Sequence, residues 1–97
     1  MITAIVLVHC EVDAIPETAQ AIADVPAISE VYSVTGDWEL VALVRVREHE
    51  EIADVVTGQI AKVPGVVGTH TMIAFRAYSQ ADLERMWGVG MPGEEGV

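Results

Sequence analysis

A six-residue segment of this chain occurs twice, and each copy joins a helical pattern to a strand pattern. The first copy is ADVPAI, residues 23–28, and the second is AKVPGV, residues 61–66. Val-Pro ends the helical pattern in both copies, because proline disfavours helical geometry in the residue before it. An apolar strand pattern also precedes each helix, so the chain reads βαβ followed by βαβ. This order predicts one four-stranded antiparallel sheet with two helices on one face.

The periodicity of apolar residues sets the expected elements and predicts a ferredoxin-like βαββαβ domain of the α+β class. Thr35-Gly36-Asp37 supplies the glycine and aspartate of a hairpin turn between the second and third strands. Residues 1–78 are expected to form the domain, and residues 79–97 a short C-terminal helix (Gln80–Trp87) and a flexible tail. Strands are expected over residues 3–9, 28–34, 39–46 and 66–78, and helices over residues 16–24 and from Glu48 until Pro64.

The charge balance limits the classes of partner. Fifteen acidic and five basic side chains give a formal net charge of −10, the opposite of the basic surface that phosphate neutralisation requires. The chain is therefore not expected to bind nucleic acid directly. Its first apolar run, Ile2–Val8, is too short to span a bilayer and has no positively charged leader before it. We expect a single-domain cytoplasmic protein.

The first and third strands are apolar on both of their alternating faces. In the third strand, Leu40, Ala42 and Val44 alternate with Val41 and Leu43. Two helices cover only one face of such a sheet, and the other face would expose an apolar patch larger than soluble monomers usually tolerate. The pattern predicts a homodimer that packs sheet against sheet. Burial of that face beneath the chain's own C-terminal segment is the alternative.

The residues that are able to carry catalysis are scattered along the chain. His9, His49 and His70 lie on the first strand, at the start of the second helix and on the last strand, and no two have the close spacing of a metal-binding pair on one element. The single cysteine, Cys10, is expected to be a buried structural residue. We therefore expect no catalytic residue, no metal and no cofactor. His70 is retained as a candidate pocket residue.

The hairpin segment VTGDWE, residues 34–39, combines a glycine that frees backbone amides with two carboxylates and a large aromatic ring. Free amides and hydroxyls hold a carboxylate, and side-chain carboxylates hold an ammonium group; every free amino acid presents both groups. The threonines of the last strand add two hydroxyls on one of its faces. An ordinary tight turn beside two β-favouring threonines is the alternative. The candidate ligand-binding residues are Thr35, Gly36, Asp37, Trp38, Glu39, Thr69 and Thr71.

From Ile2 to about Phe75 the chain resembles the effector-binding (RAM) domain of the Lrp/AsnC, or feast/famine, transcriptional regulators. The resemblance rests on the order and spacing of four marks: Val25-Pro26 before an apolar strand, VTGDWE at the hairpin, VPGV before the last strand, and Thr69-His70-Thr71 within it. It implies a ferredoxin-like domain that dimerises through its sheets as an α/β barrel and assembles further into tetramers or octamers. It also implies that an amino acid or related effector binds at contacts between dimers, with a contribution from the hairpin loop.

The family's motif can be carried over residue by residue. Its hairpin glycine matches Gly36, and the threonines of its last strand match Thr69 and Thr71. Glu39 stands where the family usually has aspartate, which lengthens the acid by one methylene. Typical members also carry an N-terminal helix-turn-helix, whereas this chain opens directly on its first strand, so it looks like a stand-alone effector domain.

The resulting hypothesis is a non-enzymatic sensor of an amino acid or small metabolite that forms a symmetric oligomer or pairs with a full-length regulator. Two alternatives stand beside it. One is a small dimeric α/β-barrel enzyme of the monooxygenase type, for which His9, His70, Trp38 and Trp87 would be the residues of interest. The other is an interaction module that binds no ligand.

Overall fold

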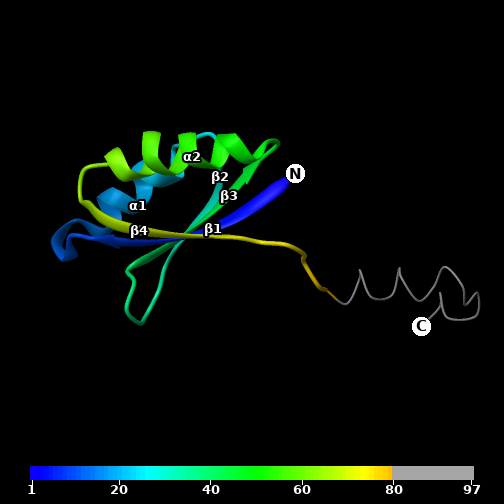
Figure 1. Ribbon diagram of the computed structural model, residues 1–97. Helices are drawn as coiled ribbons and strands as arrows, with labels where there is room; N and C mark the ends of the chain where they lie inside the picture. The colour runs from blue at the N-terminus through cyan, green and yellow to red at the C-terminus, as the bar shows by residue number, and fades with distance from the viewer. Residues whose placement is uncertain (80–97) are drawn as a thin grey trace, which may run out of the picture.

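The computed structural model describes residues 1–79 and has two layers. Four strands form one antiparallel sheet in the order β2-β3-β1-β4, and two helices lie on one of its faces (Figure 1). The ferredoxin-like fold expected from the repeat is therefore confirmed. The expected helix over Gln80–Trp87 and the tail after it lie outside the described residues. The elements are β1 (Ile2–Cys10), α1 (Ile15–Ala23), β2 (Ile28–Ser33), β3 (Leu40–Val46), α2 (His49–Gly58) and β4 (Val66–Ile73).

The strand register decides which side chains face the helices. β1 pairs with β3 from Ile2 opposite Val46 to Val8 opposite Leu40. Because directly opposite residues of antiparallel strands share a face of the sheet, every second residue of both strands points to the helical layer. These helix-side residues are Ala4, Val6, Val8 and Cys10 of β1 and Leu40, Ala42, Val44 and Val46 of β3, all buried.

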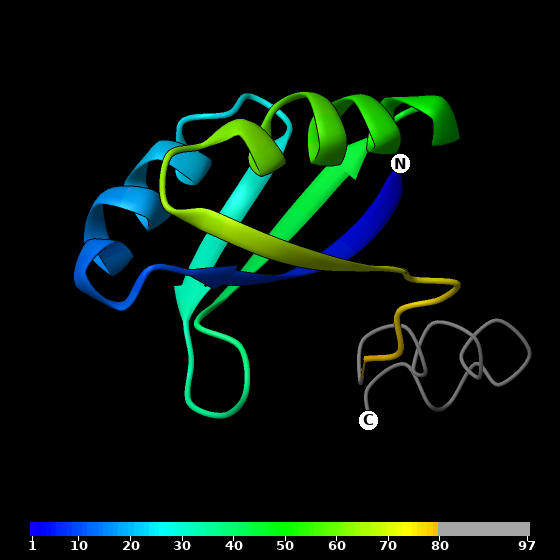
Figure 2. The ribbon, with the colours of Figure 1, turned by 60° about the vertical axis from the view of Figure 1, so that its left-hand side comes forward.

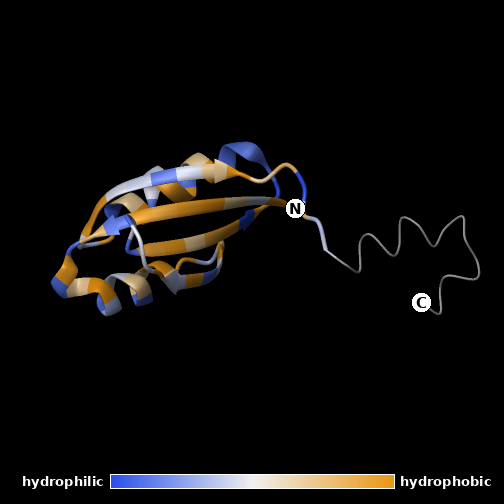
Figure 3. Cartoon of the chain, turned by 90° about the horizontal axis from the view of Figure 1, so that it is seen from below, coloured by the Kyte–Doolittle hydropathy of each residue, from blue (hydrophilic) through white to orange (hydrophobic). Residues whose placement is uncertain are grey.

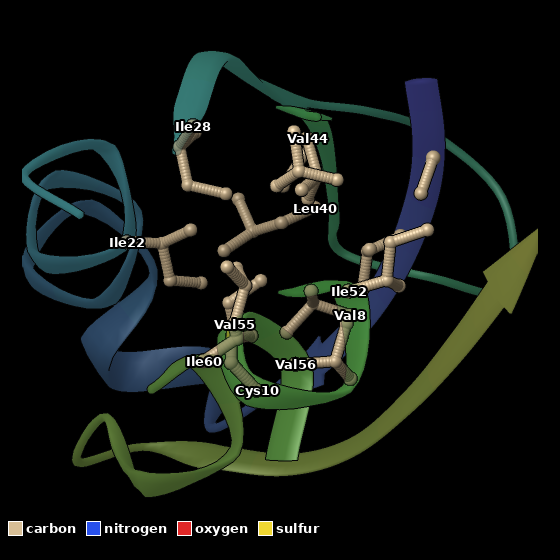
Figure 4. Packing of buried hydrophobic residues seen from close by; sticks show 14 residues of the cluster. Val8, Cys10, Ile22, Ile28, Leu40, Val44, Ile52, Val55, Val56 and Ile60 are labelled. Atoms are coloured by element: carbon tan, nitrogen blue, oxygen red, sulfur yellow. The ribbon is translucent and has the colours of Figure 1, made fainter. Parts of the chain in front are cut away.

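The core forms where both helices press their apolar sides onto this face (Figure 4). Ile22 of α1 is fully buried, as is Ile60 in the short 3-10 turn after α2. Each such side chain contributes about 1.5–3 kcal/mol to folding by leaving water. The residues of α2 that complete the core are Ile52, Val55 and Val56.

The second helix begins where the sequence predicts but ends earlier. A capping box closes its start: the Glu51 carboxylate accepts the backbone N–H of Glu48 over 2.7 Å. The expectation of one helix reaching Pro64 is wrong, because α2 ends at Gly58 and the chain continues as a 3-10 turn, Ile60–Lys62. Glycine is a poor helix former, and Gln59 leaves helical geometry with φ −127°.

The last strand is also shorter than expected. β4 ends at Ile73, whereas the alternating pattern predicts a strand to Tyr78. The reason is the length of its partner: Ala74 still donates its N–H to the carbonyl of Thr3 over 2.9 Å, and β1 itself begins at Ile2. Of the residues on this side of β1, only Ile2 and Met1 lie beyond that point, and residues 74–79 form no strand.

No described element covers the other face of the sheet, which we call the open face. Figure 3, viewed from below the sheet of Figure 1, shows hydrophobic colouring along much of the central strands. Tyr32 and Met72 at its sides are 47 % and 40 % exposed, and none of the central side chains is fully buried. The sequence expectation that apolar residues occupy both faces is thus met in the structure. The open face comprises Ile5, Leu7, Tyr32, Val41, Leu43 and Met72.

The loop between β2 and β3 projects away from the helices. In Figures 1 and 2 it extends to the bottom of the view, beyond the strands, whereas α2 lies at the top. The candidate ligand-binding residues of the hairpin therefore lie on the same side of the molecule as the open face. None of the helices in the described part of the chain is long and apolar enough to cross a membrane.

Gly65, in the second copy of the repeat, occupies a position that suits glycine alone. Its φ is +99°, and a Cβ at this residue would overlap the hydroxyl of Thr18. That hydroxyl is buried in α1 and donates to the carbonyl of Pro64 over 3.1 Å. The Gly65 carbonyl in turn accepts the N–H of Glu11 over 2.8 Å. The turn before β4 is thereby fixed against α1 and the end of β1.

Gly65→Ala is expected to destabilise the domain by about 1–3 kcal/mol from backbone strain, with a further loss from the overlap with Thr18. Urea unfolding measures the change. Gly58→Ala is the matched control, because a Cβ there meets no atom within 4 Å, and alanine is the better helix former by about 1 kcal/mol. Equal stability of Gly65→Ala and the parent chain would contradict the role assigned to this turn.

Candidate functional site

The hairpin returns the chain to the end of β1. The backbone N–H of Glu39 donates to the carbonyl of Val8 over 3.1 Å, and the N–H of Val34 donates to the carbonyl of Glu39 over 3.0 Å. These two bonds close the loop of residues 35–38. Within it, Gly36 has φ +112°, which glycine adopts without the strain that a side chain would cause.

The carboxylate of Glu39 is held by the last residues of β1. Its Oε1 accepts the backbone N–H of Cys10 over 2.9 Å and lies 3.2 Å from Nδ1 of His9. The strand register shifts between His9 and Cys10, and β1 pairs with β3 only as far as Val8. The Cys10 amide therefore has no partner on β3, and the glutamate side chain provides one.

The contacts of Glu39 favour its charged form. The Cys10 amide is the largest cause and the hydrogen bond to His9 the next, so the pKa of Glu39 lies below its ordinary value. The side chain remains 28 % exposed. Its Oε2 accepts no hydrogen bond from the described residues, so this oxygen is available to a ligand that carries a donor.

An aromatic stack lies beside this carboxylate. The rings of His9 and Trp38 are nearly parallel, at 12°, with centroids 3.8 Å apart. Trp38 also meets His70 of β4 at 6.1 Å and 40°. His70 is opposite Leu7 in the register, so its side chain belongs to the open face. We call Glu39, Trp38, His9 and His70 the hairpin cluster.

The predicted site residues fall into two groups. Thr35, Gly36 and Asp37 are exposed in the loop, and Trp38 and Glu39 are half-buried in the hairpin cluster. The structure thus gathers the five hairpin residues at one end of the sheet.

The threonines of β4 stand apart from the hairpin cluster. Thr69 and Thr71 are opposite Val8 and Val6, so they share the helix-side face and are half-buried. The sheet lies between them and Trp38. His70, which separates them in the sequence, faces the other way and does contact Trp38.

His9 is the cluster residue that the sequence interpretation did not assign to the site. Two signals in the sequence point to it. Alternation puts His9 on the same face as Leu7, and in a ferredoxin-like sheet the first strand runs beside the third, which brings its end to the hairpin. Its neighbour Cys10 is 4 % exposed, as expected of a structural cysteine.

The chemistry of Cys10 does not suit a nucleophile. Burial is the main cause that raises the pKa of its thiol, and the carboxylates of Glu39 and Glu11 add to the effect. Reactive cysteines show the opposite shift, because the thiolate is the nucleophile. Among residues 1–79, no group of three or more histidine, cysteine or acidic side chains is placed to hold a metal ion.

Comparisons with a family profile and with curated proteins point to one family of regulators. The sequence profile of the Lrp/AsnC ligand binding domain matches residues 3–83. The HTH-type transcriptional regulator FL11 of Pyrococcus horikoshii is 36% identical over 77 residues, which are 79% of this chain and 50% of the regulator. The HTH-type transcriptional regulator LysM of Saccharolobus solfataricus is 33% identical over 63 residues, 65% of this chain and 44% of the regulator. The chain spans about half the length of the curated relatives that it matches.

Two solved structures are similar to this chain over their own entire length. TTHA0845 from Thermus thermophilus is 49% identical with a TM-score of 0.78, covering 82% of this chain and 100% of that one. FFRP-DM1 is 28% identical with a TM-score of 0.73, covering 77% and 100%. A regulator of Neisseria meningitidis in complex with L-Met, NMB0573, shares the fold at 14% identity and a TM-score of 0.73, covering 81% of this chain and 53% of that one.

Glu39→Gln is expected to remove a stabilising contribution that depends on pH. Because the folded pKa of Glu39 lies below the ordinary 4.5, this contribution is complete above that value and is lost as the pH falls through the folded pKa. The difference in Tm between parent and variant should therefore be constant above about pH 5 and shrink in more acidic solution.

Thermal unfolding from neutral to acidic pH measures this difference. Asp54→Asn, on the exposed side of α2, is the matched control. Its difference in Tm from the parent chain should not shrink in acidic solution. If the difference in Tm between the parent chain and Glu39→Gln does not change with pH, the charge of the Glu39 carboxylate does not stabilise the hairpin.

Proposed function

Because the chain belongs to the Lrp/AsnC ligand-binding domain family, we propose that it is a cytoplasmic sensor of an amino acid or a related small metabolite. In this proposal the chain is a stand-alone regulatory domain. It responds to its ligand through oligomeric assembly or by pairing with a full-length regulator that carries a homologous domain. The curated relatives are transcriptional regulators, which favours a non-enzymatic role over an α/β-barrel enzyme.

The observation that carries the proposal is the pre-set carboxylate of Glu39. Two contacts to β1 fix the position of Oε1, and the His9 ring that makes one of them is stacked on Trp38. An ammonium group bound there would pair with a charge whose orientation is already set, which lowers the entropy cost of binding. The exposed hydroxyl of Thr35 and the backbone amides around Gly36 are the donors that a carboxylate needs.

The required affinity is within the reach of such a site. A metabolite sensor works at millimolar to micromolar dissociation constants, which correspond to about −4 to −8 kcal/mol. A few charge-assisted hydrogen bonds and one aromatic wall supply energies of this order. The L-Met complex of the Neisseria regulator shows that a protein with this fold accommodates an amino acid.

We include Thr69 and Thr71 in the proposal as residues that act between dimers. They lie on β4, an edge strand of the sheet, where a second dimer has access to them. Their hydroxyls would then meet a ligand held by the hairpin loop of the neighbouring dimer. Assembly into tetramers or octamers is the form of oligomer that this arrangement requires.

We propose that the open face is covered by the open face of a second copy. Its central side chains Leu7, Val41 and Leu43 are apolar, and no described element shields them. A two-fold axis brings the same patch of both chains together, so one apolar surface provides both halves of the interface. The hairpin cluster then lies at the border of this interface.

Light scattering at micromolar concentration is expected to give at least the mass of two chains. Leu43→Glu should reduce the mass to that of one chain, because it places a charge at the centre of the interface. Ala53→Glu, on the exposed side of α2, is the matched control and should leave the mass unchanged. The proposal is wrong if the parent chain has the mass of a single chain.

Thermal unfolding against a panel of free amino acids and related metabolites tests the site. A ligand at one hundred times its dissociation constant adds about 2.7 kcal/mol, which raises Tm by several degrees in a domain of this size. Asp37→Ala and Gly36→Trp should abolish the shift, whereas the control Asp13→Ala, in an exposed turn before α1, should retain it.

Two outcomes of this panel would contradict the proposal. A selective shift that survives in both hairpin variants would show that the ligand binds elsewhere. The absence of any shift across the panel would favour an interaction module that binds no amino acid.

A further inference from the structure

Two arginines converge on one cleft at the end of the sheet opposite the hairpin. The cleft has a volume of about 240 Å³ and is lined by Met1 and Thr3 of the N-terminal end, by Arg45 of β3, and by residues 74–77, which include Arg76. Arg45 is opposite Thr3 in the register, so both belong to the open-face side. The chain has only five basic residues against fifteen acidic ones. Two of the five therefore share a single concave surface.

Neither arginine is neutralised by the described part of the chain. The ion pair found among residues 1–79 joins His9 to Glu39, at the other end of β1. Neither guanidinium group takes part in a side-chain hydrogen bond with residues 1–79. Because both arginines line the same cleft, an anion bound in it would be attracted by positive charge from two separate segments of the chain.

We propose that the Arg45–Arg76 cleft is a binding site for a carboxylate. Each guanidinium presents a planar fork of donors that matches the two oxygens of a carboxylate, and the hydroxyl of Thr3 adds a further donor in the cleft. The side chain of Phe75, which is 99 % exposed, offers an apolar wall to the rest of the bound group. This site is separate from the hairpin cluster and does not depend on the ligand proposed there.

A carboxylate reaches this cleft from one of two sources. One source is a free small carboxylic acid. The other is the acidic C-terminal part of the chain itself, from the same or a second copy, which follows the lining residues 74–77 closely in the sequence. Its acidic residues are Asp82, Glu84, Glu94 and Glu95.

The test uses the full chain labelled with nitrogen-15 and follows the side-chain Nε–Hε signals of its arginines. Succinate is the probe, added at constant ionic strength with chloride as the balancing anion. The signals of Arg45 and Arg76 should move along one saturable curve, while the signal of Arg47, outside the cleft, should not. Arg45→Gln should abolish the response of Arg76, and the matched Arg47→Gln should leave it intact.

A second variant distinguishes the two sources. Asp82→Asn, Glu84→Gln, Glu94→Gln and Glu95→Gln are combined in one chain, which removes the carboxylates of these side chains but leaves the cleft. If the chain's own carboxylates bind, the Arg45 and Arg76 signals of the variant differ from those of the parent before succinate is added, and succinate reverses the difference. If only free acids bind, parent and variant give the same saturable curve. A linear, uniform drift of all arginine signals, or no response in either chain, would overturn the proposal.

Discussion

Both faces of the central strand β1 are apolar, and the described helices shield only one of them. Ala4, Val6 and Val8 are fully buried beneath the helical layer, while Ile5 and Leu7 point to the open face. Because β1 lies between β3 and β4, its register also sets which residues of both neighbours lie on each side. The same strand positions the two candidate sites, since its last residues anchor the hairpin and Thr3 lines the arginine cleft. Shielding of β1 from water is thus the requirement on which the fold, the proposed assembly and the candidate sites depend.

The sequence predicts the architecture well because its signals are local. Each signal can be recognised within a few residues: Val-Pro ends a helix, apolar residues alternate along a strand, and the glycine marks the hairpin turn. Together these signals define the βαββαβ order. The strand ends are different, because they depend on a partner. β4 ends close to the residue at which its partner β1 begins. The end of α2 at Gly58 could not be predicted from the pattern of apolar residues either. Ile60 lies beyond the helix, but it is buried and continues the helical spacing of apolar residues.

The hairpin cluster shows where prediction from the sequence reaches its limit. The segment that contains Trp38 and Glu39 is recognisable in the sequence, because it combines a glycine, two acidic residues and an aromatic residue within six positions. The contribution of His9 depends on a register shift at the end of β1 and on a side chain 30 residues away. Neither the register shift nor the distant contact can be recognised from a local pattern in the sequence. The opposite orientation of Thr69 and His70 follows from alternation alone, but which of the two faces meets Trp38 is settled only by the sheet order.

The bond between the Glu39 side chain and the Cys10 amide divides the hairpin into a fixed base and a free tip. The base satisfies a backbone donor at the sheet end, so substitutions there cost stability whatever the ligand. The tip, Thr35 to Asp37, is exposed and makes no side-chain hydrogen bond to the described residues. Replacement of Thr35 or Asp37 removes no core or sheet contact, so in the proposed sensor these two positions can change ligand preference without rebuilding the domain. Under the proposed function, one small scaffold can in this way diversify into sensors that differ at these two positions.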